Sequence, residues 1–232
     1  MKEGQLALEL AATIRHDGDG GVADDLSTPD GMAAWLRARP LLLDAAGLPS
    51  AAGAAGAAAA LGEAGVGAEV GEQVLAVRAA LRALLARAVS PAPPSRADAH
   101  RLLPADQAVA RLNAAAAGQP VVPQLDWPAV GAPAVRLLAA GTAAPPASGS
   151  RSAAEVAVAE VAAGARLAAV LARAAIGFLA GPDLVRLRAC TAPRCVRYFL
   201  KEHGRQEFCK PSCGNRARAA RHYQRHHGAP AD

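Results

Sequence analysis

Four cysteines close to the C-terminal end constrain the fold of this chain more than any other feature. They all lie within 24 of the 232 residues, in the spacing C-x4-C-x13-C-x3-C. Each short-spaced pair can supply two thiolates from a single turn, and four thiolates match the tetrahedral preference of Zn²⁺. The sequence therefore predicts one structural zinc ion, bound by Cys190, Cys195, Cys209 and Cys213.

Other uses of four clustered cysteines agree less well with this spacing. Disulfides are rare in the cytoplasm, where we expect this protein to be located. Neither pair has the C-x-x-C spacing of a redox motif. An iron–sulfur cluster also takes four thiolates and stays the alternative metal. Because four protein ligands leave no open position for water, the predicted zinc is structural rather than catalytic.

Positive charge is concentrated at the same end of the chain as the cysteines. Residues 186–227 contain eleven Lys and Arg residues against two acidic residues, a net charge of +9, whereas residues 1–185 carry a net charge of −3. An asymmetry of this kind indicates an anionic partner for the basic end alone.

A helix is predicted directly after the last cysteine, over residues 215–227, with Gly214 and Asn215 suited to the turn and the N-cap before it. At about 100° per residue, three arginines cluster on one face with a histidine beside them. Guanidinium groups match phosphates and the guanine edge. The predicted nucleic-acid-binding residues are Arg205, Lys210, Arg218, Arg221, His222 and Arg225.

The opposite face of this helix, with Ala219, Ala220 and Tyr223, is predicted to pack on the zinc core. Arg216 points to the same side as Tyr223 on a helical wheel. We therefore expect Arg216 to pair with an acidic group or with backbone carbonyls inside the finger. The residues with predicted structural roles in the finger are Gly214, Asn215, Arg216 and Tyr223.

The rest of the chain is predicted to be mostly helical, from apolar residues at helical spacing and from cap and stop signals. The first predicted helix begins at residue 29 and stops before Pro40. Three further helices are predicted over residues 69–89, 105–117 and 152–179. On the helix over residues 69–89, the arginines Arg78, Arg82 and Arg87 are predicted to lie off the apolar face.

Strands are few in this sequence. Alternating residues predict short strands over residues 6–13, 22–26 and 119–127. The Ala/Gly-rich residues 49–67 predict a weak helix or a poorly ordered loop, and residues 145–150 predict a loop. The fold class is therefore a mostly α N-terminal domain with a small β element (α+β), over residues 1–182, followed by a small C-terminal zinc-finger module over residues 186–227.

The longest apolar run, residues 156–180, is rich in alanine and contains Glu160, Arg166 and Arg173. Charges at these positions favour a buried or amphipathic helix over a membrane span. The N-terminus lacks the uninterrupted apolar region of a signal peptide. We therefore expect a cytoplasmic protein with no membrane partner.

Two known families share motifs with this chain. Cys213-Gly214-Asn215-Arg216, preceded by Leu187-Arg188-x-Cys190 and by Tyr198-Phe199, resembles the CGNR zinc-finger family. The residues LALEL at positions 6–10, Leu26-x-Thr28-Pro29 and Trp35-Leu36 resemble the ABATE domain that usually precedes this finger. The resemblance implies a bacterial transcription regulator, described as stress-related, whose finger binds DNA.

Two classes of function agree with these features. The first is a DNA-binding regulator whose N-terminal domain senses a small-molecule effector or forms a homodimer, although the basic pattern fits RNA as well as DNA. The alternative is a zinc-stabilised module for protein–protein interaction that does not bind nucleic acid. We expect no enzyme activity and assign no catalytic residue, because no Ser-His-Asp constellation, P-loop or nucleotide-binding glycine motif is recognisable.

Overall fold

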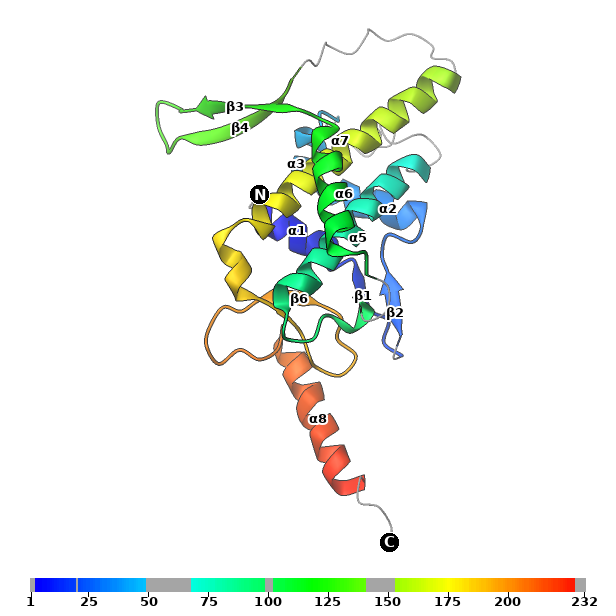
Figure 1. The fold of residues 1–232 in the computed structure, drawn as a ribbon, viewed down its shortest axis with the longest axis vertical. Helices are drawn as coiled ribbons and strands as arrows, with labels where there is room; N and C mark the ends of the chain where they lie inside the picture. The colour runs from blue at the N-terminus through cyan, green and yellow to red at the C-terminus, as the bar shows by residue number, and fades with distance from the viewer. Residues whose placement is uncertain (1–2, 20, 49–67, 99–101, 141–152, 228–232) are drawn as a thin grey trace. The chain divides into compact units, whose positions relative to one another are not determined.

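The computed structural model of the protein describes residues 3–19, 21–48, 68–98, 102–140 and 153–227. Within them, helices predominate and the strands form three two-stranded antiparallel sheets (Figure 1). This confirms the predicted α+β class. Residues 49–67 and 145–150, for which a weak helix or loop and a loop were predicted, lie outside the described residues.

The elements follow one another along the chain in this order: α1 (Glu3–Ala11), β1 (Ile14–His16), β2 (Val22–Asp24), α2 (Pro29–Arg37), α3 (Pro40–Ala45), α5 (Ala68–Val89), the 3-10 helix η1 (Arg96–Asp98), α6 (Ala105–Ala117), β3 (Val121–Asp126), β4 (Ala134–Ala139), α7 (Ala153–Leu179), the 3-10 helix η2 (Pro182–Arg186), β5 (Leu187–Ala189), β6 (Tyr198–Leu200) and α8 (Pro211–His227).

The chain divides into two compact units, each built from separate stretches of sequence. The first unit contains Met1–Asp25, Arg78–Val109 and Ala174–Asp232, and the second contains Leu26–Val77 and Ala110–Arg173. Helices α5, α6 and α7 each contribute residues to both units. The four cysteines and α8 therefore belong to the same packed unit as α1 and the C-terminal half of α5.

The predicted strand over residues 6–13 is wrong, because these residues form most of helix α1. The buried residues Leu6, Ala7, Leu10 and Ala11 are spaced as one face of a helix, not as alternate residues of a strand. Alanine, leucine and glutamate also have high helix propensity. The prediction of a strand near residue 22 is confirmed by β2, which pairs with β1 in the register Ile14↔Asp24 to His16↔Val22.

Helix α5 confirms the helix predicted over residues 69–89, and two of the arginines predicted off its apolar face are buried. Arg78 and Arg82 are only 6% and 2% exposed. Arg78 donates to both carboxylate oxygens of Asp24, at 2.5 Å each, and to Thr13 Oγ1 at 2.9 Å. These arginines can be buried because acidic and polar groups from other segments of the first unit satisfy their donors.

The second unit begins with helix α2, which starts as the sequence predicts. Thr28 Oγ1 accepts a hydrogen bond from the Gly31 backbone N–H at 3.1 Å, and Pro29 occupies the first helical position. The helix buries Trp35 and Leu36 and ends at Arg37. The predicted strand over residues 119–127 is confirmed by β3, whose hairpin partner β4 was not predicted.

Helix α7 confirms the long helix predicted over residues 152–179. Its residues Val161–Leu179 are long and apolar enough to cross a membrane by length and composition alone, and 56% of this window is buried inside the structure. Core helices pass the same test of length and composition.

Candidate metal centre and basic helix

The four cysteine sulfur atoms lie together, all within 4.8 Å of one another. Cys195 Sγ is 3.7 Å and Cys213 Sγ is 3.5 Å from Cys209 Sγ. Four thiolates at about 2.3 Å from a tetrahedral zinc ion would be about 3.8 Å apart. The cysteines are buried except for Cys209, which is half-buried. The site therefore has the number of ligands, the distances between sulfur atoms and the burial of a structural metal centre.

Tight backbone turns bring the first pair of ligands together. Cys190 follows β5, and its backbone N–H donates to the Arg197 carbonyl at 2.9 Å, while the Cys195 N–H donates to the Ala192 carbonyl at 3.0 Å. Arg194, just before Cys195, adopts a left-handed conformation with φ of 63°. Ala192 is fully buried in this turn, so a larger side chain would have no space there.

The second pair of ligands is joined by the start of helix α8. Cys209 precedes the helix and Cys213 lies in its first turn, where the Cys213 N–H donates to the Lys210 carbonyl at 3.0 Å. A helix N-terminus carries partial positive charge, which favours a thiolate. The helix starts at Pro211, four residues earlier than predicted, so Gly214 and Asn215 lie inside it and do not form its cap.

Close contacts among the sulfurs shift the pKa values of two cysteines in opposite directions. Hydrogen bonds with Cys195 and Cys209 lower the pKa of Cys190 to about 3. The same hydrogen bonding, with burial, raises the pKa of Cys209 above its ordinary value. A divalent cation can take the place of thiol protons, which is why metal binding by cysteines releases protons.

Arg216 contacts the metal centre directly. Its Nη2 donates to Cys213 Sγ at 3.1 Å, and the side chain is half-buried. The sequence had suggested an acidic group or backbone carbonyls as its partner, and the structure instead places a ligand sulfur there. Four thiolates around a divalent ion leave two negative charges in excess, so a guanidinium group beside one sulfur is favourable.

The face of α8 that packs on the metal centre also differs from the prediction. Cys213, Gly214 and Ala217 are buried, whereas Tyr223 is 65% exposed and Ala219 is exposed. The predicted packing of Tyr223 and Ala219 is therefore wrong. The reason is the earlier helix start, since the first two turns of α8 already cover the cysteines and the later turns extend beyond them.

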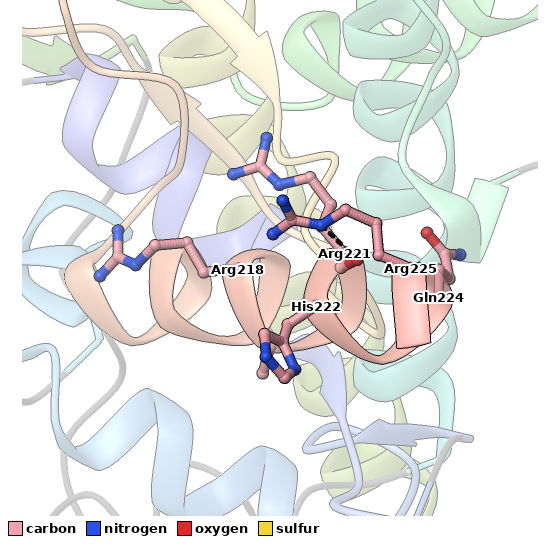
Figure 2. A pocket seen from close by; sticks show the side chains of 6 residues that line it. Arg218, Arg221, His222, Gln224 and Arg225 are labelled. Atoms are coloured by element: carbon pink, nitrogen blue, oxygen red, sulfur yellow. Dashed lines mark hydrogen bonds between the residues drawn. The ribbon is translucent and has the colours of Figure 1, made fainter. Parts of the chain in front are cut away.

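The three predicted arginines lie along the exposed part of α8. Figure 2 shows the side chains of Arg218, Arg221 and Arg225 on one side of the helix and the His222 ring on the other, and all four residues border an open hollow. His222 packs against His226, with ring centroids 4.3 Å apart. Arg218 donates to Asn215 Oδ1, and Arg225 Nε donates to the Arg221 carbonyl at 3.4 Å.

Arg205 and Lys210, the other two predicted contact residues, are exposed in the segment between β6 and α8. The predicted cationic groups are therefore all accessible to a partner. His222 is exposed as well but does not point with the three arginines (Figure 2).

A buried polar network joins the finger to the rest of the first unit, and sequence reasoning missed it. Arg82 Nε and Nη2 donate to the two carboxylate oxygens of Asp98 at 2.8 and 3.0 Å. Tyr198 of the finger donates its hydroxyl to Asp98 at 2.7 Å, and Ser95 Oγ donates to the Val196 carbonyl at 2.8 Å. Burial and the Asp98 carboxylate raise the pKa of Tyr198, which keeps this hydroxyl protonated.

This network has little signal in the sequence. Arg82 lies in an alanine-rich helix where arginines usually face solvent, and Asp98 is one of many isolated acidic residues. The one usable hint is that Tyr198 belongs to the finger motif, because a buried tyrosine needs a partner for its hydroxyl group. Identifying that partner requires the three-dimensional structure, since Asp98 lies 100 residues away in sequence.

The fold and this site together define the class of the protein, a metal-binding finger on a mostly helical body. A family model described as "Putative stress-induced transcription regulator", named ABATE, matches residues 4–182, and the model of the CGNR zinc finger matches residues 186–226. The chain belongs to the ABATE family and carries a C-terminal CGNR zinc finger. No curated protein matches the chain.

Proposed function

We propose that this protein holds one structural zinc ion in its finger and binds DNA through helix α8, as a transcription regulator of the bacterial cytoplasm. The observation that carries the proposal is the coupling of two features in one helix. The first turn of α8 supplies Cys213 to the metal centre, and the following turns carry three exposed arginines on one side.

The charge environment of these arginines supports nucleic acid as the partner. In the part of the chain that the structure describes, Arg218, Arg221 and Arg225 form no ion pair. Their guanidinium groups are therefore available to phosphates, which receive half or more of the hydrogen bonds in protein–DNA complexes. The exposed part of α8 after Ala217 is also helical, and the DNA major groove admits an α-helix.

Fluorescence anisotropy with a labelled random-sequence DNA duplex, and with an RNA duplex as a second arm, tests this proposal. We expect binding at low salt that the double variant Arg218→Ala/Arg221→Ala weakens at least tenfold. The control variant is Arg37→Ala/Arg87→Ala, which removes two exposed arginines outside the finger. If the wild-type chain with zinc binds neither duplex at low salt, the proposal is wrong.

The alternative is a finger that binds an acidic protein surface. The finger contacts the rest of the first unit through Tyr198 and Val196. None of the α8 arginines takes part in those contacts, so they are also accessible to a protein partner. If the affinity for a duplex falls steeply as salt is raised, and falls alike for different duplexes, nucleic acid is the supported partner. Capture of an acidic protein by a chain that binds no duplex would support the alternative.

The second unit offers a place for the proposed effector. A hollow of about 390 Å³ lies between α5, α6 and α7, which is within the size range of small-molecule pockets. It is lined mainly by small side chains, including Ala76, Ala115 and Ala168, with Arg111 as its charged member. Ala115→Leu would fill the hollow and should abolish the thermal shift caused by an effector, whereas Ala117→Leu on the same helix should not.

A further inference from the structure

The hairpin of β3 and β4 has one face made entirely of apolar residues. Residues that pair across an antiparallel ladder point to the same face, so the observed register divides the hairpin into two sets. The set that we call the apolar face contains Val121, Pro123, Leu125, Val135, Leu137 and Ala139. The other face carries Gln124, Arg136 and Asp126, and Arg136 Nε lies 3.2 Å from Asp126 Oδ2.

This apolar face is largely open to solvent. Leu125 is 69%, Val135 is 68% and Leu137 is 44% exposed, and the adjoining turn adds Trp127 at 68% and Val130 at 92%. Antiparallel sheets usually bury their apolar face and expose the polar one, and an isolated two-stranded hairpin is at best marginally stable in water. The pattern of this hairpin is therefore that of a sheet whose apolar face is covered by a partner.

The amount of exposed apolar surface is large enough for a stable interface. The large apolar side chains on this face and its turn expose on the order of 650 Å², which is slightly below the about 800 Å² that each partner contributes to a standard protein–protein interface. Single patches on monomeric proteins are usually smaller, at about 300–600 Å².

We propose that the apolar face of the β3–β4 hairpin is a homodimer interface, in which two copies of the chain pack this face against each other about a two-fold axis. The face carries no charged side chain, so two identical copies meet without like-charge repulsion. The charged residues of the strands, Asp126 and Arg136, neutralise each other on the other face. The hairpin thus lacks the excess of basic residues by which amphipathic surfaces bind anionic membranes.

Pro123 favours packing of faces over the addition of a strand at the β3 edge. A proline has no N–H to donate, and within a sheet it is tolerated where its nitrogen faces the open edge. The β3 edge therefore lacks a donor that a newly added strand would need. Packing face against face requires no backbone hydrogen bonds between the copies, and Pro123 contributes apolar surface to it.

Light scattering coupled to size-exclusion chromatography of the zinc-loaded full chain tests the interface. We expect the wild type at tens of micromolar to have twice the chain mass of 23.4 kDa. Leu137→Glu, on the apolar face, should shift the protein to monomer and raise the dimer Kd at least tenfold. Leu138→Glu is the matched control, because Leu138 is the next residue, is also 44% exposed and lies on the other face.

Leu125→Gln on β3 is a milder second variant that should also weaken the dimer, and circular dichroism of each variant checks that the helices remain folded. A monomeric wild type would overturn the proposal, as would a dimer that Leu137→Glu and Leu138→Glu affect equally. These measurements use no nucleic acid, so their failure would leave the proposed DNA binding standing.

Discussion

At the scale of single residues, Arg216 and Arg218 illustrate how two arginines separated by one residue can have different roles. Arg216 donates to the Cys213 sulfur, and its Nε is buried without a hydrogen-bond partner among the described residues. Arg218 is exposed and contacts Asn215 on the surface of the helix. The first therefore belongs to the surroundings of the metal, and the second to the surface that a partner can reach.

Arg216→Ala should lower zinc affinity more than it lowers the intrinsic affinity of the zinc-loaded finger for DNA. Groups that contact metal ligands typically contribute 10- to 100-fold to metal affinity, and we expect a loss in this range. Competition with a chromophoric chelator measures it. Arg218→Ala is the control and should keep wild-type zinc affinity while weakening DNA binding. The opposite ranking of the two variants would show that Arg216 does not support the metal centre.

The buried pair of Arg82 and Asp98 gives a second prediction at this scale. Asp98→Ala leaves the Arg82 guanidinium buried without its counter-charge, so we expect a loss of about 3–5 kcal/mol in the free energy of unfolding. Tyr198→Phe removes one hydrogen bond to the same carboxylate and should cost about 1–3 kcal/mol. Urea denaturation of the zinc-loaded protein measures both. Equal losses in the two variants would contradict the central position of Asp98.

At the scale of elements, the first unit combines pieces that the sequence suggests are separate. The finger contributes Tyr198 and Val196 to the network around Asp98, and Arg82 also donates to the Ala11 carbonyl at the end of α1. Leu187 and Tyr198 of the finger are themselves buried, at 1% and 6% exposure. The finger therefore lacks the independence of a module joined by a flexible linker.

Zinc removal should consequently loosen more than the finger. If the finger folded independently, only residues 186–227 would unfold without metal and the body would stay folded. Since Ser95, Asp98 and Arg82 are paired with finger groups, we expect amide hydrogen exchange to accelerate in residues 78–98 as well after chelation. Mass-spectrometric hydrogen exchange with and without chelator measures this effect. Unchanged protection of residues 78–98 would show that the body holds its structure alone.

The elements also show where sequence patterns are informative. Helix α2 was predictable because its cap, its proline and its buried residues follow local rules. The cysteine cluster was predictable because ligand spacing is itself local. Strand β4 was not predicted and α1 was predicted as a strand. A short apolar segment can match the 3.6-residue period of a helix and the two-residue period of a strand equally well. The partners of Arg78 and Arg82 depend on residues far away in sequence, which no local pattern contains.

At the scale of the whole molecule, the proposed DNA binding depends on the charge distribution and on the proposed dimer. The net charge of +9 in residues 186–227 stands against −3 in residues 1–185, so the basic end should contact phosphates while the rest of the chain does not attract them. One finger offers three arginines on α8, which is few for selective binding. A dimer formed through the hairpin would contain two such helices, and dimeric DNA-binding proteins bind two half-sites.

This combination predicts a salt dependence that changes with association. The logarithm of the DNA-binding constant falls with a slope of about −0.9 per phosphate contacted. Three phosphate contacts from each of two fingers therefore predict a slope of about −5 for the wild-type dimer. For the monomeric Leu137→Glu variant, three contacts predict a slope of about −3. Anisotropy titrations across a range of salt concentrations measure both slopes, with Leu138→Glu as the control that should keep the wild-type slope. A common slope for all three proteins would mean that the hairpin does not bring two fingers to one DNA molecule, whether or not each finger binds DNA by itself.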